Sequence, residues 1–128
     1  MGNNWKITDT LTKVFADEVP DGQGSIRLST LHRETVSCVI AYLGAADWGR
    51  YWKVSVKAPE KIETRLRRIE LVPSAYPCHK EQDDNYLRIV PGMYPDLLRD
   101  LDTEDDGADK KYLTKEVPGQ WRSLWLDV

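Results

Sequence analysis

The sequence has little cysteine and no long apolar run. Two cysteines, Cys38 and Cys78, are too few for a disulfide framework. Cys38 lies in an apolar run and is expected to be a small buried side chain, whereas Cys78 lies in a polar segment, and pairing between them stays open. No apolar run approaches the roughly 18 residues that span a bilayer, and the first residues lack the charged and apolar blocks of a secretion signal. We therefore expect no membrane partner; the compartment stays open, with the cytoplasm favoured.

Neither sign of charge is in large excess, because 18 basic and 21 acidic side chains leave a formal net charge of −3. The basic surplus of a nucleic-acid-binding domain is absent, so no nucleic-acid partner is expected. A chain of 128 residues has the size of one domain with one core. Residues 1–128 are therefore predicted to form a single domain.

The sequence also lacks the motifs of common enzyme classes, including G-x-S-x-G and the phosphate-binding P-loop. Residues 78–84 supply a cysteine, a histidine and two aspartates, but not the repeated C-x-x-C or H-x-x-x-H spacing of a zinc site. The acidic run at 100–109 has almost no apolar anchors and is expected to face solvent. His32 and Glu34 share one side of an expected strand, where a surface ion pair is the simpler explanation. No catalytic residue, cofactor or metal is therefore expected within the chain.

Tryptophan and tyrosine are abundant, with five and six residues against a single phenylalanine. Each brings a polar atom that needs a partner or the surface, a bias that carbohydrate-binding proteins and β-sandwich cores share. The segment 47–52 places Trp48, Tyr51 and Trp52 in or beside a turn. Alternation assigns Trp52 to the core, whereas Trp48 and Tyr51 are candidates for contact with a sugar, for contact with another protein surface, or for local packing.

Alternation of apolar and polar residues with a period of two predicts several short strands. The predicted strands are residues 25–30, 35–43, 52–57, 60–73 and 120–128, with 6–15 as a weaker candidate. Residues 35–43 carry apolar side chains at both odd and even positions, which is typical of a central strand covered on both faces. The alternation within 60–73 slips once, which predicts a β-bulge near Arg67 and Arg68.

Short strands without a convincing long helix indicate an all-β fold, an antiparallel β-sandwich of the immunoglobulin-like or galactose-binding-like kind. Segments 74–86 and 99–119 are expected to be long irregular connections. The shared interior is expected to contain Ile26, Leu28, Val36, Cys38, Ile40, Val54, Val56, Leu71 and Leu124. The chain ends in its most apolar strand, which indicates a piece cut from a longer protein, with the sandwich truncated at its C-terminal strand.

Residues 87–101, LRIVPGMYPDLLRDL, contain two prolines and a glycine within an apolar stretch. Proline fixes φ and biases the preceding residue toward extended conformations, so the stretch is expected to be neither an ordinary strand nor the start of a helix. We predict a preorganised loop that holds Met93, Tyr94 and Leu97 in a definite place. These side chains either form a docking surface for a second domain or close one end of the sandwich core.

Five motifs occur in a fixed order along nearly the whole chain. They are LTKVFADEVP, HRETVSCVIAY, RRIELVPSAY, PGMYPDLL and PGQWRSLWLDV. In this order they resemble the N-terminal β-sandwich domain of glycoside hydrolase family 123 and its uncharacterised relatives, with PGMYPDLL and the W-x-x-L-W strand as the distinctive pieces. One departure is Cys38-Val39, where the family-like pattern has an aromatic residue followed by glutamine.

The resemblance implies a domain that precedes a catalytic barrel in the same parent chain. In such proteins the barrel carries an adjacent Asp-Glu pair that runs retaining hydrolysis of β-linked N-acetylgalactosamine with help from the substrate's acetamido group. No such barrel is present in the sequence, so we expect a non-catalytic accessory domain that acts as a scaffold or docks to its barrel. Two alternatives stay open: a carbohydrate-binding module that holds a glycan with Trp48, Tyr51 and Tyr94, and a free-standing hydrolase that uses His32 and Glu34.

Overall fold

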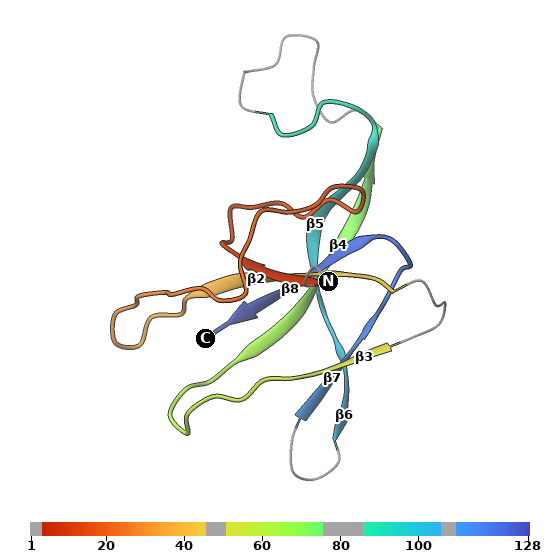
Figure 1. The fold of residues 1–128 in the computed structure, drawn as a ribbon. Coiled ribbons are helices and arrows are strands. Elements are labelled where there is room, and N and C mark those ends of the chain that lie inside the picture. Colours follow the sequence, from red (N-terminus) through yellow and green to blue (C-terminus); the bar gives the residue numbers. More distant parts are fainter. Residues whose placement is uncertain (1–3, 46–50, 76–85, 106–109) are drawn as a thin grey trace.

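The computed structural model describes residues 4–45, 51–75, 86–105 and 110–128 of the chain. Every regular element in these residues is a strand (Figure 1). The strands are β1 (Trp5–Thr8), β2 (Ser37–Leu43), β3 (Tyr51–Ser55), β4 (Arg65–Ser74), β5 (Gly92–Asp100), β6 (Asp102–Asp105), β7 (Lys110–Lys115) and β8 (Trp121–Asp127). In the described ranges no helix is long and apolar enough to cross a membrane.

The strands form two sheets, and every pairing within them is antiparallel. The larger sheet has the order β1-β2-β8-β4-β5, and the smaller sheet has the order β3-β7-β6. The prediction of an all-β antiparallel sandwich is confirmed. The last strand along the chain, β8, is the central strand of the larger sheet (Figure 1).

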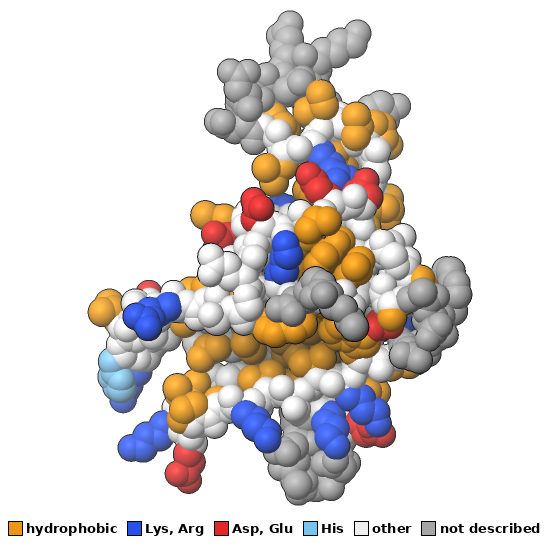
Figure 2. All heavy atoms as spheres, in the orientation of Figure 1, with side chains coloured by type: hydrophobic (Ala, Val, Ile, Leu, Met, Phe, Trp, Pro, Cys, Tyr) orange, Lys and Arg blue, Asp and Glu red, His pale blue; other side chains and the backbone are white. Residues whose placement is uncertain are grey.

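The main core lies between the two sheets. Tyr42, Leu66 and Leu124 contribute to it from β2, β4 and β8. Tyr112 joins them from β7, and Trp52 of β3 packs with its ring centroid 4.8 Å from that of Tyr42. Figure 2 shows hydrophobic side chains gathered in a band across the middle of the molecule, where the layers meet. The sheets are held together because β2, β3 and β8 turn alternate side chains toward this interior.

The strands predicted at 35–43, 52–57 and 120–128 are confirmed by β2, β3 and β8. In β3 the prediction holds residue by residue. Trp52 and Val54 pack against the core cluster, while the side chains between and beside them are exposed.

A second core cluster covers the opposite face of the larger sheet. Val14, from the segment that follows β1, packs there against Val39 of β2 and Trp121 of β8. The backbone N–H of Trp121 donates to the carbonyl of Ala16 at 3.0 Å, which fixes the segment over the sheet. β2 is therefore covered on both faces, as the apolar residues at both its odd and its even positions predict.

The strand predicted at 25–30 is wrong. After the isolated bridge between Ile7 and Gln23 the chain leaves the sheet, and residues 25–30 pair with none of the described strands. Alternation does not by itself make a strand, because the backbone N–H and C=O groups need a partner strand. Ile26 and Leu28 are consequently 37% and 38% exposed and do not belong to the interior.

The other residues assigned to the interior are at least partly buried. Cys38 and Leu124 are buried, and Val36, Ile40, Val54, Val56 and Leu71 are of intermediate exposure. Cys38 is buried, and burial raises the pKa of its thiol. Cys78 lies outside the described residues, so its pairing with Cys38 stays open.

Residues 87–101 contain the whole of β5, so the prediction that they form no ordinary strand is wrong. β5 runs through Tyr94, Pro95 and the two following leucines. It is the end strand in the order of the larger sheet. An edge strand tolerates proline, because a missing N–H on its outer side interrupts no ladder.

A β-bulge exists, but it does not lie at residues 67–68 of β4 as predicted. The register shifts between Glu70 and Leu71, where two adjacent residues of β4 pair with residues two apart in β5. Asp96 is the extra residue, so the bulge belongs to β5. The strands predicted at 6–15 and 60–73 are also shorter than expected, since β1 ends at residue 8 and β4 begins at residue 65.

Residues 99–119 contain the β6–β7 hairpin instead of an irregular connection. Its register places Glu104 opposite Lys111, and the Lys53 ammonium of β3 lies 2.8 Å from the Glu104 carboxylate. Opposite charges across neighbouring strands stabilise such a pairing, which an acidic run alone does not reveal. The side chains of residues 102–104 face solvent, as the composition predicts.

Candidate functional site

Three of the five predicted contact residues lie on one strand. Met93 and Leu97 are exposed on β5, and Tyr94 between them is half-buried. Tyr51 is exposed at the start of β3 in the other sheet, and Trp48 lies outside the described residues. The structure therefore groups the β5 residues and places Tyr51 apart from them.

The chain immediately before β5 adds further apolar side chains that sequence reasoning missed. The display surface, as we call it, consists of Leu87 (70% exposed), Ile89 (51%), Val90 (57%), Met93 (47%) and Leu97 (43%). Figure 2 shows hydrophobic side chains exposed at the upper end of the molecule, over the start of β5. The apolar residues just before Pro91-Gly92 were the sequence signal that could have identified this surface.

Arg88 fastens this region to the segment that follows β1. Its guanidinium donates to Asp17 at 2.7 Å and to Glu18 at 3.0 Å, and it lies 3.8 Å from the centroid of the Phe15 ring. The hydrogen bond from Arg88 lowers the pKa of Asp17, which keeps the carboxylate ionised at neutral pH. The residues on either side of Arg88 are therefore held in a defined position.

Tyr94 adds a second fastening. Its ring packs edge-on against that of Phe15, with centroids 5.8 Å apart and planes at 81°. Its hydroxyl donates to the carbonyl of Val90 at 2.5 Å, which closes the turn around the Pro-Gly pair. The ring and hydroxyl of Tyr94 thus stabilise this turn, and its role as a contact residue stays a prediction.

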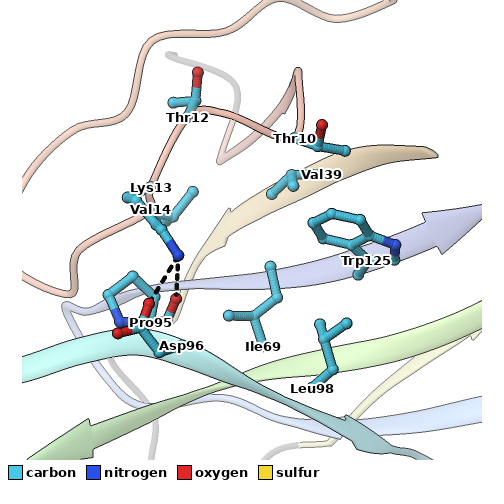
Figure 3. Close-up of a pocket in the computed structure, with 10 residues that line it drawn as sticks. All are labelled: Thr10, Thr12, Lys13, Val14, Val39, Ile69, Pro95, Asp96, Leu98 and Trp125. Atoms are coloured by element: carbon cyan, nitrogen blue, oxygen red, sulfur yellow. Dashed lines mark hydrogen bonds and ion pairs between the residues drawn. The ribbon is translucent and has the colours of Figure 1, made fainter.

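A cavity of about 190 Å³, which we call the Trp125 slot, lies between the segment after β1 and the larger sheet (Figure 3). Its apolar side is formed by Ile69, Leu98 and Trp125 of β4, β5 and β8. At the other end the Lys13 ammonium lies 2.7 Å from a carboxylate oxygen of Asp96 and 3.3 Å from the carbonyl oxygen of Pro95. The slot therefore has an apolar end and a charged end.

Hydrogen bonds centred on the Asp127 carboxylate hold the Trp125 ring in place. Its Nε1–H donates to Asp127 at 2.7 Å, and the same carboxylate accepts from the Ser37 hydroxyl at 2.6 Å and the Arg67 guanidinium at 2.8 Å. Burial alone would raise the pKa of Asp127, but the hydrogen bonds from Ser37, Trp125 and Arg67 outweigh it and lower the pKa. Asp127 is therefore a carboxylate at neutral pH and holds the indole in one orientation.

Asp127→Asn is expected to lower the free energy of unfolding by about 1–2 kcal/mol at pH 7, because hydrogen bonds to a charged acceptor are lost. The folded-state pKa lies below the ordinary value of 3.8. The stabilisation is therefore complete above about pH 4 and disappears as the pH falls through the folded-state pKa. Urea unfolding of both proteins from pH 7 to pH 2 should show the difference shrinking with acid, whereas a constant difference would contradict this assignment.

His32 and Glu34 lie in a turn outside the strands. The Glu34 carboxylate accepts the backbone N–H of Leu31 at 2.9 Å and the hydroxyl of Thr30 at 3.2 Å, and Arg33 has a φ of 66°. Glu34 thus stabilises its own turn. No cluster of three or more histidine, cysteine or acidic side chains suited to a metal occurs in the described part of the chain, and residues 78–84 lie largely outside it.

No family model matches the sequence, and no curated protein matches it either. The resemblance to glycoside hydrolase family 123 therefore remains a prediction from the motifs. Two features of the described residues bear on function, the display surface and the Trp125 slot.

Proposed function

We propose that the chain is a non-catalytic accessory domain of a glycoside hydrolase family 123-like protein, and that it docks through the display surface to the catalytic barrel of the same parent chain. The observation that carries the proposal is the exposure of Leu87, Ile89, Val90, Met93 and Leu97 next to one another along the chain. Single exposed apolar residues are common on protein surfaces, whereas a contiguous group marks an interaction site.

The fastening of the display surface also favours docking. Arg88 and Tyr94 tie it to the segment after β1 through ion pairs, a ring contact and the hydrogen bond to Val90. A surface that is already ordered loses little conformational entropy when a partner covers it. The display surface is therefore suited to a fixed interface between two folded domains.

The edge of β5 favours contact through side chains over the addition of another strand. Pro95 lacks an N–H, and the bulge at Asp96 interrupts the regular ladder. Both features are known to protect edge strands against open-ended pairing. The register pairs Met93 with Pro73 and Leu97 with Glu70, so the two side chains point to opposite faces of the sheet. A barrel that packs its own apolar side chains around this edge, against both residues, satisfies this geometry.

The double variant Met93→Asp/Leu97→Asp is expected to weaken binding to the separately expressed barrel of the parent protein by about 30-fold or more, as loss of an interface hot spot does. Both side chains are exposed, so the unfolding free energy of the chain should change by less than about 1 kcal/mol. Isothermal titration calorimetry measures the binding, and urea unfolding measures the stability.

The matched control is Leu31→Asp/Ile62→Asp, which adds the same two charges at exposed residues outside the display surface. This control should bind the barrel as the unchanged chain does. Equal affinity of the β5 variant and the control would contradict the proposal. So would hydrolysis of an aryl N-acetyl-β-galactosaminide by the chain alone, if a substitution within the chain abolished it.

A further inference from the structure

The Trp125 slot is not part of the display surface and needs its own explanation. Four strands and the segment after β1 build it, and the described structure leaves about 190 Å³ open between them. Small-molecule sites usually have about 300–1,000 Å³, so this slot has room for a single ring. Its mixture of an aromatic ring, aliphatic side chains and a few polar groups is the usual composition of a ligand site.

The apolar end offers a preorganised surface. Trp125 cannot turn without breaking its hydrogen bond to Asp127, which Ser37 and Arg67 hold in turn. Figure 3 shows the indole ring at one end of the cavity, with Ile69 and Leu98 beside it and the Lys13–Asp96 pair at the far end. A ligand therefore meets carbon atoms on one side and charges on the other.

The charged end offers both donors and acceptors. An ammonium group has three N–H donors and a carboxylate has two oxygens. Lys13 uses its donors on Asp96 and on the carbonyl of Pro95, and the ion pair engages only one Asp96 oxygen. Two adjacent hydroxyl groups on a ligand, each of which donates and accepts hydrogen bonds, match the Lys13–Asp96 pair.

We propose that the Trp125 slot binds one pyranose ring, with the C–H face of the sugar against Trp125 and Leu98 and two of its hydroxyl groups on Lys13 and Asp96. A pyranose has an apolar face and a rim of hydroxyl groups, which is the division that the slot presents. The small size and partial openness of the slot predict weak binding, with a Kd on the order of 1–10 mM. This site differs from the docking surface and does not depend on it.

The test is a titration of the ¹⁵N-labelled chain with the methyl glycosides of galactose, glucose and mannose, followed by indole and amide chemical shifts. The Trp125 indole signal is assigned by its loss in Trp125→Phe. At least one glycoside should shift this signal with saturation in the millimolar range. If none shifts it, the proposal is overturned.

Lys13→Met removes the charged end and is expected to weaken binding about tenfold or more. Its matched control is Lys53→Met, which removes a similarly exposed lysine from the ion pair with Glu104 on the other sheet. The control should bind as the unchanged chain does, and urea unfolding should show both variants folded. Equal affinity for Lys13→Met would overturn the proposal.

Cyclohexylmethanol serves as an apolar probe of similar ring size. A proper sugar site binds it more weakly than the preferred glycoside, because most of the hydroxyl groups are missing. Equal or tighter binding of cyclohexylmethanol would overturn the proposal and identify the slot as a pocket for an apolar group. The display surface carries neither Lys13 nor Trp125, so failure here leaves the docking test unaffected.

Discussion

Leu124→Ala is expected to lower the free energy of unfolding by about 3–5 kcal/mol, the upper part of the range for large-to-small changes in a core. Leu124 is 1% exposed and belongs to β8, which is paired on both sides within the larger sheet. Its neighbours in the cluster include Tyr42 and Leu66 of the same sheet and Tyr112 of the other. These strands are held by pairing on several sides, so the cavity cannot easily collapse.

Urea or guanidinium unfolding followed by circular dichroism measures this loss. Leu11→Ala is the matched control, because Leu11 is 87% exposed and should cost less than about 0.5 kcal/mol. A loss below about 1 kcal/mol for Leu124→Ala would show that the two sheets are not packed against each other at this point.

Gly44→Ala is expected to destabilise the fold by about 3 kcal/mol or more, because the added Cβ has no room. A Cβ at this position would lie 2.0 Å from the carbonyl oxygen of Val117, and a backbone atom cannot move aside as the end of a side chain can. The Gly44 N–H donates to Gln120 at 3.0 Å, and the Gly44 carbonyl accepts from Gly119 at 3.2 Å. Relief of the clash therefore disrupts the connection that leads into β8.

Gly24→Ala is the control, because a Cβ there meets nothing within 4 Å. Its effect should stay within about 1 kcal/mol, with a small stabilisation possible from reduced freedom of the unfolded chain. Thermal unfolding of the two variants compares them directly. Equal stability of Gly44→Ala and Gly24→Ala would contradict the close approach of residues 44 and 117.

The sequence was informative where a strand has covered faces. Apolar residues at both odd and even positions of 35–43 predict a central strand. β2 is such a strand, with the smaller sheet on one face and Val14 on the other. The alternation of Trp52 and Val54 predicts β3 for the same reason. Because a buried strand face requires apolar side chains, the positions of apolar residues in the sequence predict which faces are buried.

The sequence misled where pairing, and not burial, decides the structure. Ile26 and Leu28 alternate as strand residues do, yet no described strand lies beside them. β5 contains Pro95 and β6 is acidic, and both are strands because a neighbouring strand satisfies one side of their backbone. The identity of a strand's neighbour is a long-range property that local periodicity does not carry.

The candidate sites were predictable to different degrees. Met93 and Leu97 could be named from the proline-braced apolar stretch, but their exposure depends on the position of β5 at the edge of the larger sheet, which the sequence does not show. The Trp125 slot could not, since Lys13, Asp96 and Trp125 are far apart in the sequence. They meet only because the segment after β1 crosses the larger sheet beside β5.

The most direct test of the proposed docking role is backbone amide hydrogen exchange, measured for the chain alone and for the chain joined to the catalytic barrel that the proposal places in the same parent protein. We predict that exchange in residues 86–98 slows when the barrel is present, while the strands of the inner core exchange at the same rates in both proteins. Unchanged exchange across residues 86–98, with new protection confined to another surface, would contradict the assignment of the display surface as the docking site.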